Sequence, residues 1–120
     1  MVREIACKKY HDIAFLDDNS PIAIGKIDNL ERYKYSYDAI VAIGNQRKRK
    51  EIIERLEVLC FNIVSIISDK AFVSQSSIIE AGCVIEPMAV INTGAKIKKG
   101  TFINAGAIVN HNEVVSEFCK

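Results

Sequence analysis

The chain has 120 residues, the size of one domain or of two small lobes that share an interface. Hydrophobic residues make up 49% of it, so a real core can form, and the net charge of +1 argues against a nucleic-acid partner. The only basic run, Arg47–Lys50, stands at the start of a helical pattern and is expected to be a solvated helix face. No apolar stretch approaches the roughly 18 residues of a membrane-spanning helix, and the first residues lack the form of a signal peptide.

The four cysteines, Cys7, Cys60, Cys83 and Cys119, are spread along the chain without a CxxC pair. Their spacing predicts neither a zinc site nor a disulfide framework. We expect reduced thiols in a cytoplasmic protein, buried as small hydrophobic side chains more readily than used as nucleophiles.

The first third of the chain predicts short, alternating elements. A short helix with an apolar stripe begins near Val2, and residues 11–16 have the composition of a buried strand. The cluster Asp17–Pro21 predicts a turn, which a short extended piece over 22–25 and a short helix over 28–35 follow.

The middle of the chain predicts a unit of strand, helix and strand. The continuous apolar run 37–43 is typical of a strand in a parallel sheet, and Asn45 is a natural N-cap for a helix over 46–60. A further strand is expected over 61–67. This alternation is an α/β arrangement, and we place its boundary at residue 68.

Polar residues follow two of these strands. In α/β sheets, ligands lie beyond the carboxyl ends of the strands. Asp17 and Asp18 could accept hydrogen bonds from ribose hydroxyls or a base edge, while Gly44 and Asn45 start a helix whose free N–H groups favour phosphate. Arg47 or Arg49 could add a bidentate phosphate contact. On these residues alone, a plain turn and a plain helix cap are the commoner explanations.

The remainder of the chain, from Ala71, can be written in groups of six. The third position of every group is aliphatic: Val73, Ile79, Ile85, Ile91, Ile97, Ile103, Val109 and Val115. Six residues fit a short strand followed by a corner, and three such faces close a triangular coil of 18 residues. The first position is small and glycine recurs at the sixth, where a corner can require positive φ. The pattern predicts a left-handed parallel β-helix over 69–120, with about two and two-thirds coils.

The second position of each group is also apolar, in Phe72, Ile78, Val84, Val90, Phe102, Ile108 and Val114. Alternation turns this column outward if the third position faces inward. Such a column needs either a neighbouring subunit or a cover from the N-terminal lobe.

Taken together, FLDDN (15–19), AIGNQRKRKEI (42–52) and hexapeptide repeats with an Asn-His step at Asn110–His111 resemble the sialic-acid and bacillosamine-type sugar acetyltransferases. The resemblance implies a Rossmann-like lobe that binds a nucleotide sugar and a left-handed β-helix. It implies a trimer with sites between subunits, in which acetyl passes from acetyl-CoA to an amino or hydroxyl group of the sugar.

Residue by residue, the resemblance places Asp17, Asp18, Gly44 and Asn45 beside the nucleotide of the sugar. It gives His111 the role of the general base, for which an imidazole that titrates near neutrality is suited. A solvated corner histidine is the alternative. No resident metal is implied, and a zinc enzyme of the γ-carbonic-anhydrase type would need three histidines where this chain has two.

The sequence also departs from the family pattern. Relatives begin with a strand and a glycine-rich loop, whereas this chain starts in the helix that follows them. They often carry an acid after the histidine, where this chain has Asn112, and they continue for several more coils that hold acetyl-CoA. The expectation is a chain shortened at both ends, and the alternative to an enzyme is a non-catalytic, oligomerising β-helix module that retains nucleotide-sugar binding.

Overall fold

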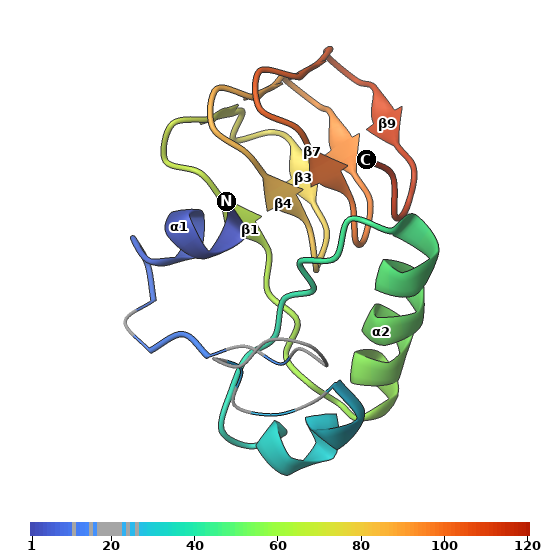
Figure 1. Ribbon diagram of the computed structural model, residues 1–120. Helices are drawn as coiled ribbons and strands as arrows, with labels where there is room; N and C mark the ends of the chain where they lie inside the picture. The colour runs from blue at the N-terminus through green and yellow to red at the C-terminus, as the bar shows by residue number, and fades with distance from the viewer. Residues whose placement is uncertain (11, 15, 17–22, 24, 26) are drawn as a thin grey trace.

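The computed structural model describes residues 1–10, 12–14, 16, 23, 25 and 27–120. Three helical segments come first: α1 (Val2–Ala6), the 3₁₀ helix η1 (Ile27–Tyr33) and α2 (Gln46–Val58). Nine strands of two residues follow: β1 (Ile66–Ile67), β2 (Phe72–Val73), β3 (Ile78–Ile79), β4 (Val84–Ile85), β5 (Val90–Ile91), β6 (Lys96–Ile97), β7 (Phe102–Ile103), β8 (Ile108–Val109) and β9 (Val114–Val115). Figure 1 shows the strands stacked at one end of the molecule, with α1 beside β1, and η1 at the other end.

The strands form three parallel sheets, ordered β1-β4-β7, β2-β5-β8 and β3-β6-β9. Each strand pairs with the one 18 residues further along, as in Ile66 with Val84 and Val84 with Phe102. This is the left-handed parallel β-helix that the hexapeptide pattern predicts. The ladder begins at Ile66, so the described chain makes three coils of three strands.

The aliphatic third position fills the inside of the prism, as predicted. In the middle of the stack Ile85, Ile91 and Ile97 are fully buried, whereas Val73 and Val115 in the outer coils are only partly buried. Full burial of one such side chain contributes roughly 1.5–3 kcal/mol. The middle coil therefore carries the greatest share of the packing energy.

The corners bend at the sixth position through the left-handed region of backbone space. Gly82, Gly94, Gly100 and Gly106 have φ of 70–75°, and the non-glycine residues Met88, Asn112 and Phe118 have φ of 57–65°. A left-handed conformation costs an L-residue roughly 1–2 kcal/mol, which is why glycine is favoured there. Asn112 thus supplies the left-handed residue of the corner that carries His111.

The N-terminal lobe contains less sheet than the apolar runs predict. Among the described residues of the four expected strands outside the β-helix, pairing is limited to two isolated parallel bridges, Leu16 with Gly25 and Ala39 with Ile63. The second bridge joins the two sides of α2 and is a minimal strand–helix–strand unit. The expected strand over 61–67 divides, because Ile63 pairs within the lobe while Ile66 belongs to the β-helix.

Helix α2 is capped at both ends. The Asn45 side chain accepts a hydrogen bond from the Lys48 N–H at 2.9 Å, which confirms the expected N-cap. At the other end the N–H of Phe61 donates to the Leu56 carbonyl and that of Cys60 to the Glu57 carbonyl, with Cys60 at φ 61°. This is a Schellman motif, in which the left-handed residue is a cysteine. The described helices include none with the length and apolarity to cross a membrane.

Candidate functional site

The expected nucleotide-binding residues divide into two groups. Asp17 and Asp18 lie outside the described residues. Gly44 and Asn45 form an exposed loop between the apolar segment 37–43 and α2, and a Cβ added to Gly44 would lie 3.2 Å from Lys120 Nζ. Free N–H groups and an ammonium group thus share one small region, which suits an anion.

Arg49 has a different place from the one expected. Its side chain is fully buried, and its five N–H donors match five backbone carbonyls. Nη1 donates to Ile43 at 3.0 Å and to Gly44 at 3.1 Å, Nε to Gly100 at 2.9 Å, and Nη2 to Phe118 at 2.7 Å and Cys119 at 3.2 Å. Because every donor is in use, the guanidinium cannot also bind a phosphate. The expected direct contact between Arg49 and a phosphate is therefore wrong.

The surroundings of Arg49 explain this burial. The guanidinium carbon lies 4.4 Å from the centroid of the Phe102 ring, an arrangement that stabilises a cation. Desolvation lowers the pKa of Arg49, while the nearby Cys119 raises it, and an arginine remains charged at neutral pH. The sequence carries a signal for this position that the charge-run interpretation missed: residues 49, 53 and 56 share one helix face, and Ile53 and Leu56 are both buried.

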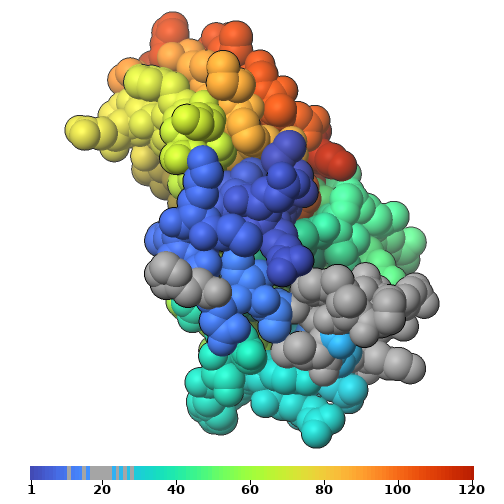
Figure 2. All heavy atoms as spheres, turned by 60° about the vertical axis from the view of Figure 1, so that its left-hand side comes forward, coloured from blue at the N-terminus to red at the C-terminus, as the bar shows by residue number. Residues whose placement is uncertain are grey.

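A pocket of about 870 Å³ lies in the N-terminal lobe, a volume typical of small-molecule sites. Its walls are mainly apolar, and its polar groups include Arg3, Asp12, Asp38 and Lys48. Ile43 and Lys48 line it, so the pocket lies next to the loop at the start of α2. Figure 2 shows the N-terminal segment, which supplies part of this lining, between the β-helix and η1.

His111 lies at the corner between β8 and β9 and is exposed. The next residue, Asn112, has φ 60° and anchors the corner through its N–H, which donates to the Thr93 carbonyl of the preceding coil. The imidazole is therefore presented to solvent on a fixed backbone. Among the described residues, no group of three or more His, Cys, Asp or Glu could hold a metal ion.

The three faces of the β-helix differ in exposure. On the β1-β4-β7 sheet the outward residues Ile66, Val84 and Phe102 are buried, because α1 and α2 pack over this face. On the β2-β5-β8 sheet Phe72 is 61% and Ile108 64% exposed, and on the β3-β6-β9 sheet Ile78 and Val114 are exposed. The lobe thus covers one face. On the other two faces the apolar side chains of the outer strands stay bare, while the middle strands carry the half-buried Val90 and Lys96.

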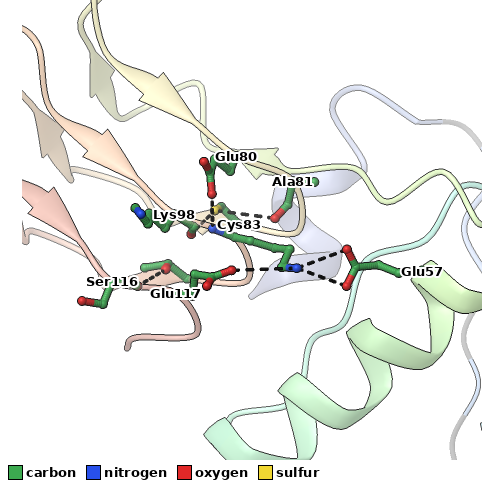
Figure 3. Close-up of polar contacts among 9 residues, drawn as sticks. Glu57, Glu80, Ala81, Cys83, Lys98, Ser116 and Glu117 are labelled. Carbon is green, nitrogen blue, oxygen red and sulfur yellow. Dashed lines mark hydrogen bonds and ion pairs between the residues drawn. The ribbon is translucent and has the colours of Figure 1, made fainter.

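The covered face ends at a corner that joins β-helix and α2. Gly82, Gly100 and Phe118 are stacked there, with Ile53 of α2 against them. Figure 3 shows the ion pairs that add to this contact: Lys99 Nζ lies 3.2 Å from Glu57 of α2 and 3.8 Å from Glu117. The hydrogen bond to Glu57 raises the pKa of Lys99 despite partial desolvation.

The same corner contains a column of three side-chain donors. Ser65 Oγ donates to the Glu80 carbonyl at 2.7 Å, Cys83 Sγ to the Lys98 carbonyl at 3.2 Å and Thr101 Oγ1 to the Ser116 carbonyl at 2.8 Å, part of which is visible in Figure 3. Burial raises the pKa of the Cys83 thiol, and hydrogen bonds from neighbouring backbone groups only partly oppose this. Cys83 is therefore a structural donor and a poor nucleophile.

Comparison with known proteins adds to this geometry. Residues 1–56 match the sequence family described as the PglD N-terminal domain. The acetyltransferase domain of PglB from Neisseria gonorrhoeae, solved in complex with acetyl coenzyme A, superposes with a TM-score of 0.89 at 34% identity, over 98% of this chain and 62% of that one. The same domain without the ligand gives a TM-score of 0.93.

A second solved protein, PerB from Caulobacter crescentus in complex with CoA and GDP-perosamine, has a TM-score of 0.89 at 25% identity. It matches over 98% of this chain and 60% of that one. The family resemblance is confirmed. The chain is similar in sequence and fold to these acetyltransferases over nearly its whole length, and it spans about three fifths of the length of the solved relatives. A search of curated proteins gave no match.

Proposed function

We propose that this protein takes part in the transfer of acetyl from acetyl-CoA to an amino or hydroxyl group of a nucleotide sugar. The observation that carries the proposal is the combination of a PglD-type lobe and a β-helix that superposes on an acetyl-CoA-bound acetyltransferase domain. The PerB complex holds CoA together with a nucleotide sugar, which supports the same pair of substrates.

His111 is proposed as the general base. Its exposed imidazole accepts the proton of the attacking amine or hydroxyl group as that group forms a bond to the thioester carbonyl carbon. The carbon–sulfur bond then breaks, the imidazolium gives its proton to the departing sulfur, and CoA leaves as its thiol, so these steps use no metal. Gly44 and Asn45 are proposed to bind the phosphates of the sugar nucleotide at the start of α2, with Asp17 and Asp18 toward its ribose or base.

We propose that the site is shared between subunits, and the geometry of one chain supports this. Through Arg49, the Gly44 loop is tied to the corner of Gly100 and Phe118, whereas His111 lies at another corner of the same triangular coil. We propose a homotrimer in which His111 of one chain approaches the nucleotide loop of the next. The bare apolar columns of two sheet faces support such an assembly.

The oligomer is tested by light scattering. A trimer is expected, and Phe72→Lys combined with Ile108→Lys should convert it to monomer, because both exposed residues lie on one bare face. Val58→Lys is the matched control, since Val58 is 81% exposed but lies on α2. Dissociation by the control as well, or a wild type that is monomeric, would rule out this interface.

Catalysis is tested by following acetyl-CoA consumption with UDP- and GDP-linked amino sugars. His111→Ala should abolish turnover, while Gln75→Ala, at the exposed equivalent position of the corner two coils earlier, should leave it unchanged. Asn45→Asp keeps a good N-cap but places a carboxylate against the phosphates, so it should impair sugar binding. In a 1:1 mixture of His111→Ala and Asn45→Asp chains, a shared site recovers activity in about a quarter of sites, because the two halves come from different subunits. No recovery after verified subunit exchange would exclude sharing.

The alternative function is a non-catalytic oligomerising module that keeps nucleotide-sugar binding. The exposed apolar residues on two faces of the β-helix are the observation that favours it, because they suit self-association. A trimer that UDP-sugars stabilise against heat, but that saturating acetyl-CoA does not, would decide for this alternative. We also propose a cytoplasmic location, which the four free cysteines support, because a reducing compartment keeps thiols in this state.

A further inference from the structure

Arg49 is a buried cation that has only neutral partners. It is fully buried, its five hydrogen bonds all end on backbone carbonyls, and its flat face rests on Phe102. Burying a charge is costly, and an apolar side chain on the same helix face would fill the space without that cost. The arginine therefore contributes something other than packing.

The bonds to Ile43 and Gly44 fix the direction of two consecutive peptide units. In a planar trans peptide the N–H points away from the C=O of the same unit. Since both carbonyls are directed at Arg49 Nη1 in the interior, the N–H groups of Gly44 and Asn45 are directed outward. Both residues are exposed, so these N–H groups are open to a ligand.

The other bonds of Arg49 fix where this loop lies. Nε and Nη2 hold the carbonyls of Gly100, Phe118 and Cys119, which belong to one corner of the β-helix and the segment that follows it. One side chain thus joins the loop at the start of α2 to the last coil. A loop held from only one side would keep several conformations and would have to lose them on binding.

We propose that Arg49 is a positioning residue for the sugar nucleotide: it turns the N–H groups of Gly44 and Asn45 toward the diphosphate and locks them to the β-helix without touching the ligand. The inference rests on the proposed function, because the diphosphate is the ligand that this function assigns to the loop. It replaces the direct Arg49–phosphate contact, which the buried geometry excludes.

The test uses Arg49→Lys in the full chain, with UDP and GDP as probes. Lysine keeps the positive charge but lacks the planar fork and cannot reach all five carbonyls. The dissociation constant for UDP, measured by calorimetry, should rise about tenfold, equivalent to about 1.4 kcal/mol. In ¹⁵N-resolved spectra UDP should shift the Gly44 and Asn45 amides of the wild type, and the variant should lose this response.

The matched control is Ile53→Val, which perturbs a fully buried residue on the same helix face four residues further on. It should lower stability yet leave the UDP dissociation constant within about twofold, because Ile53 packs against the corner glycines Gly82 and Gly100 and donates no hydrogen bond to the loop. A purely structural Arg49 would behave like Ile53. If Arg49→Lys does not fold, Phe102→Leu removes the ring beneath the guanidinium and should weaken UDP binding about threefold.

The outcomes separate the two proposals. In one outcome the wild type binds UDP with a dissociation constant that Arg49→Lys, or Phe102→Leu in its place, does not change. This result overturns the positioning role alone and leaves the proposed function standing. A wild type that binds neither UDP nor GDP at millimolar concentration overturns nucleotide binding by the lobe, and with it the role of Arg49. If Arg49→Lys and Ile53→Val weaken UDP binding equally, the positioning role of Arg49 is also overturned, because the loss of binding then reflects lower stability of the fold.

Discussion

Gly100 offers the sharpest test of how α2 is seated on the β-helix. Its φ is +70°, and a methyl group at its Cβ position would lie 2.5 Å from Phe118 Cδ1 and 3.0 Å from Ile53 Cδ1. Both neighbours are buried, so neither can swing into solvent. Gly100→Ala therefore combines left-handed strain of roughly 1–2 kcal/mol with overpacking of roughly 1–3 kcal/mol.

Gly106→Ala is the matched control because its φ is +75° and nothing lies within 4 Å of the added methyl. Gly106→Ala is destabilised by the left-handed strain alone. In both variants alanine makes the unfolded chain less flexible, which stabilises the folded state by about 0.4–1 kcal/mol. The difference between the two free energies of unfolding is thus about 1–3 kcal/mol. For 120 residues the unfolding entropy is roughly 2.1 cal/mol/K per residue, so this difference corresponds to about 4–12 °C in Tm.

Gly94→Ala adds a second comparison. Its methyl would overlap the side-chain oxygen of Asn112, yet Asn112 is exposed and can rotate away. Its cost should resemble that of Gly106→Ala. Calorimetry at one fixed protein concentration measures all three, since association shifts Tm. Equal losses at Gly100 and Gly106 would refute the packing of Phe118 and Ile53 against this corner.

Three further predictions concern the same region, each measured by urea unfolding. Lys99→Met should cost about 0.5–1 kcal/mol at neutral pH; because Glu57 raises the pKa of Lys99, the wild type should lose this advantage as the pH rises through that pKa. A difference that persists at high pH would contradict the ion pair. Cys83→Ala should lower the free energy of unfolding by about 1 kcal/mol more than Cys83→Ser, which keeps the hydrogen-bond donor. In the native protein the Cys83 thiol should react with disulfide reagents far more slowly than the exposed Cys7. Cys60→Gly should stabilise the chain by roughly 0.5–1 kcal/mol, because the C′ residue of α2 has φ 61°; no gain would mean that the cap is already relaxed.

The β-helix could be predicted because one local rule repeats. Each hexapeptide from Ala71 places an aliphatic residue inside, and all but the first place a left-handed residue at the corner, so the fold follows from period and residue size. The first strand was missed although the signal was present. Ser65–Lys70 follows the same frame, with Ile66 and Ile67 at its second and third positions and Ser65 in the donor column of Cys83.

The lobe could be predicted only in part, because a strand is defined by its partners. The apolar run 37–43 resembles a central strand, but within the described chain it pairs through Ala39 alone and otherwise lines the pocket. Hydropathy cannot distinguish these two uses of an apolar segment.

Arg49 shows a different limit. Its residue type suggested a surface phosphate contact, whereas its spacing from Ile53 and Leu56 indicated the buried face. Spacing was the better guide, since it reports the direction of the side chain. The identity of its partners depends on long-range packing against the corner around residues 100 and 118, which no local pattern contains.

The buried arginine also supports the proposal that the site is shared between chains. To bring the Gly44 loop to His111 of its own β-helix, the lobe would have to leave its corner and expose a cation held by five hydrogen bonds. Such a hinge is far more costly than a contact between the bare apolar faces that carry Phe72 and Ile108. We therefore expect the proposed site to form by association, so that loss of the proposed trimer abolishes the proposed acetyl transfer while the proposed nucleotide binding by each lobe persists.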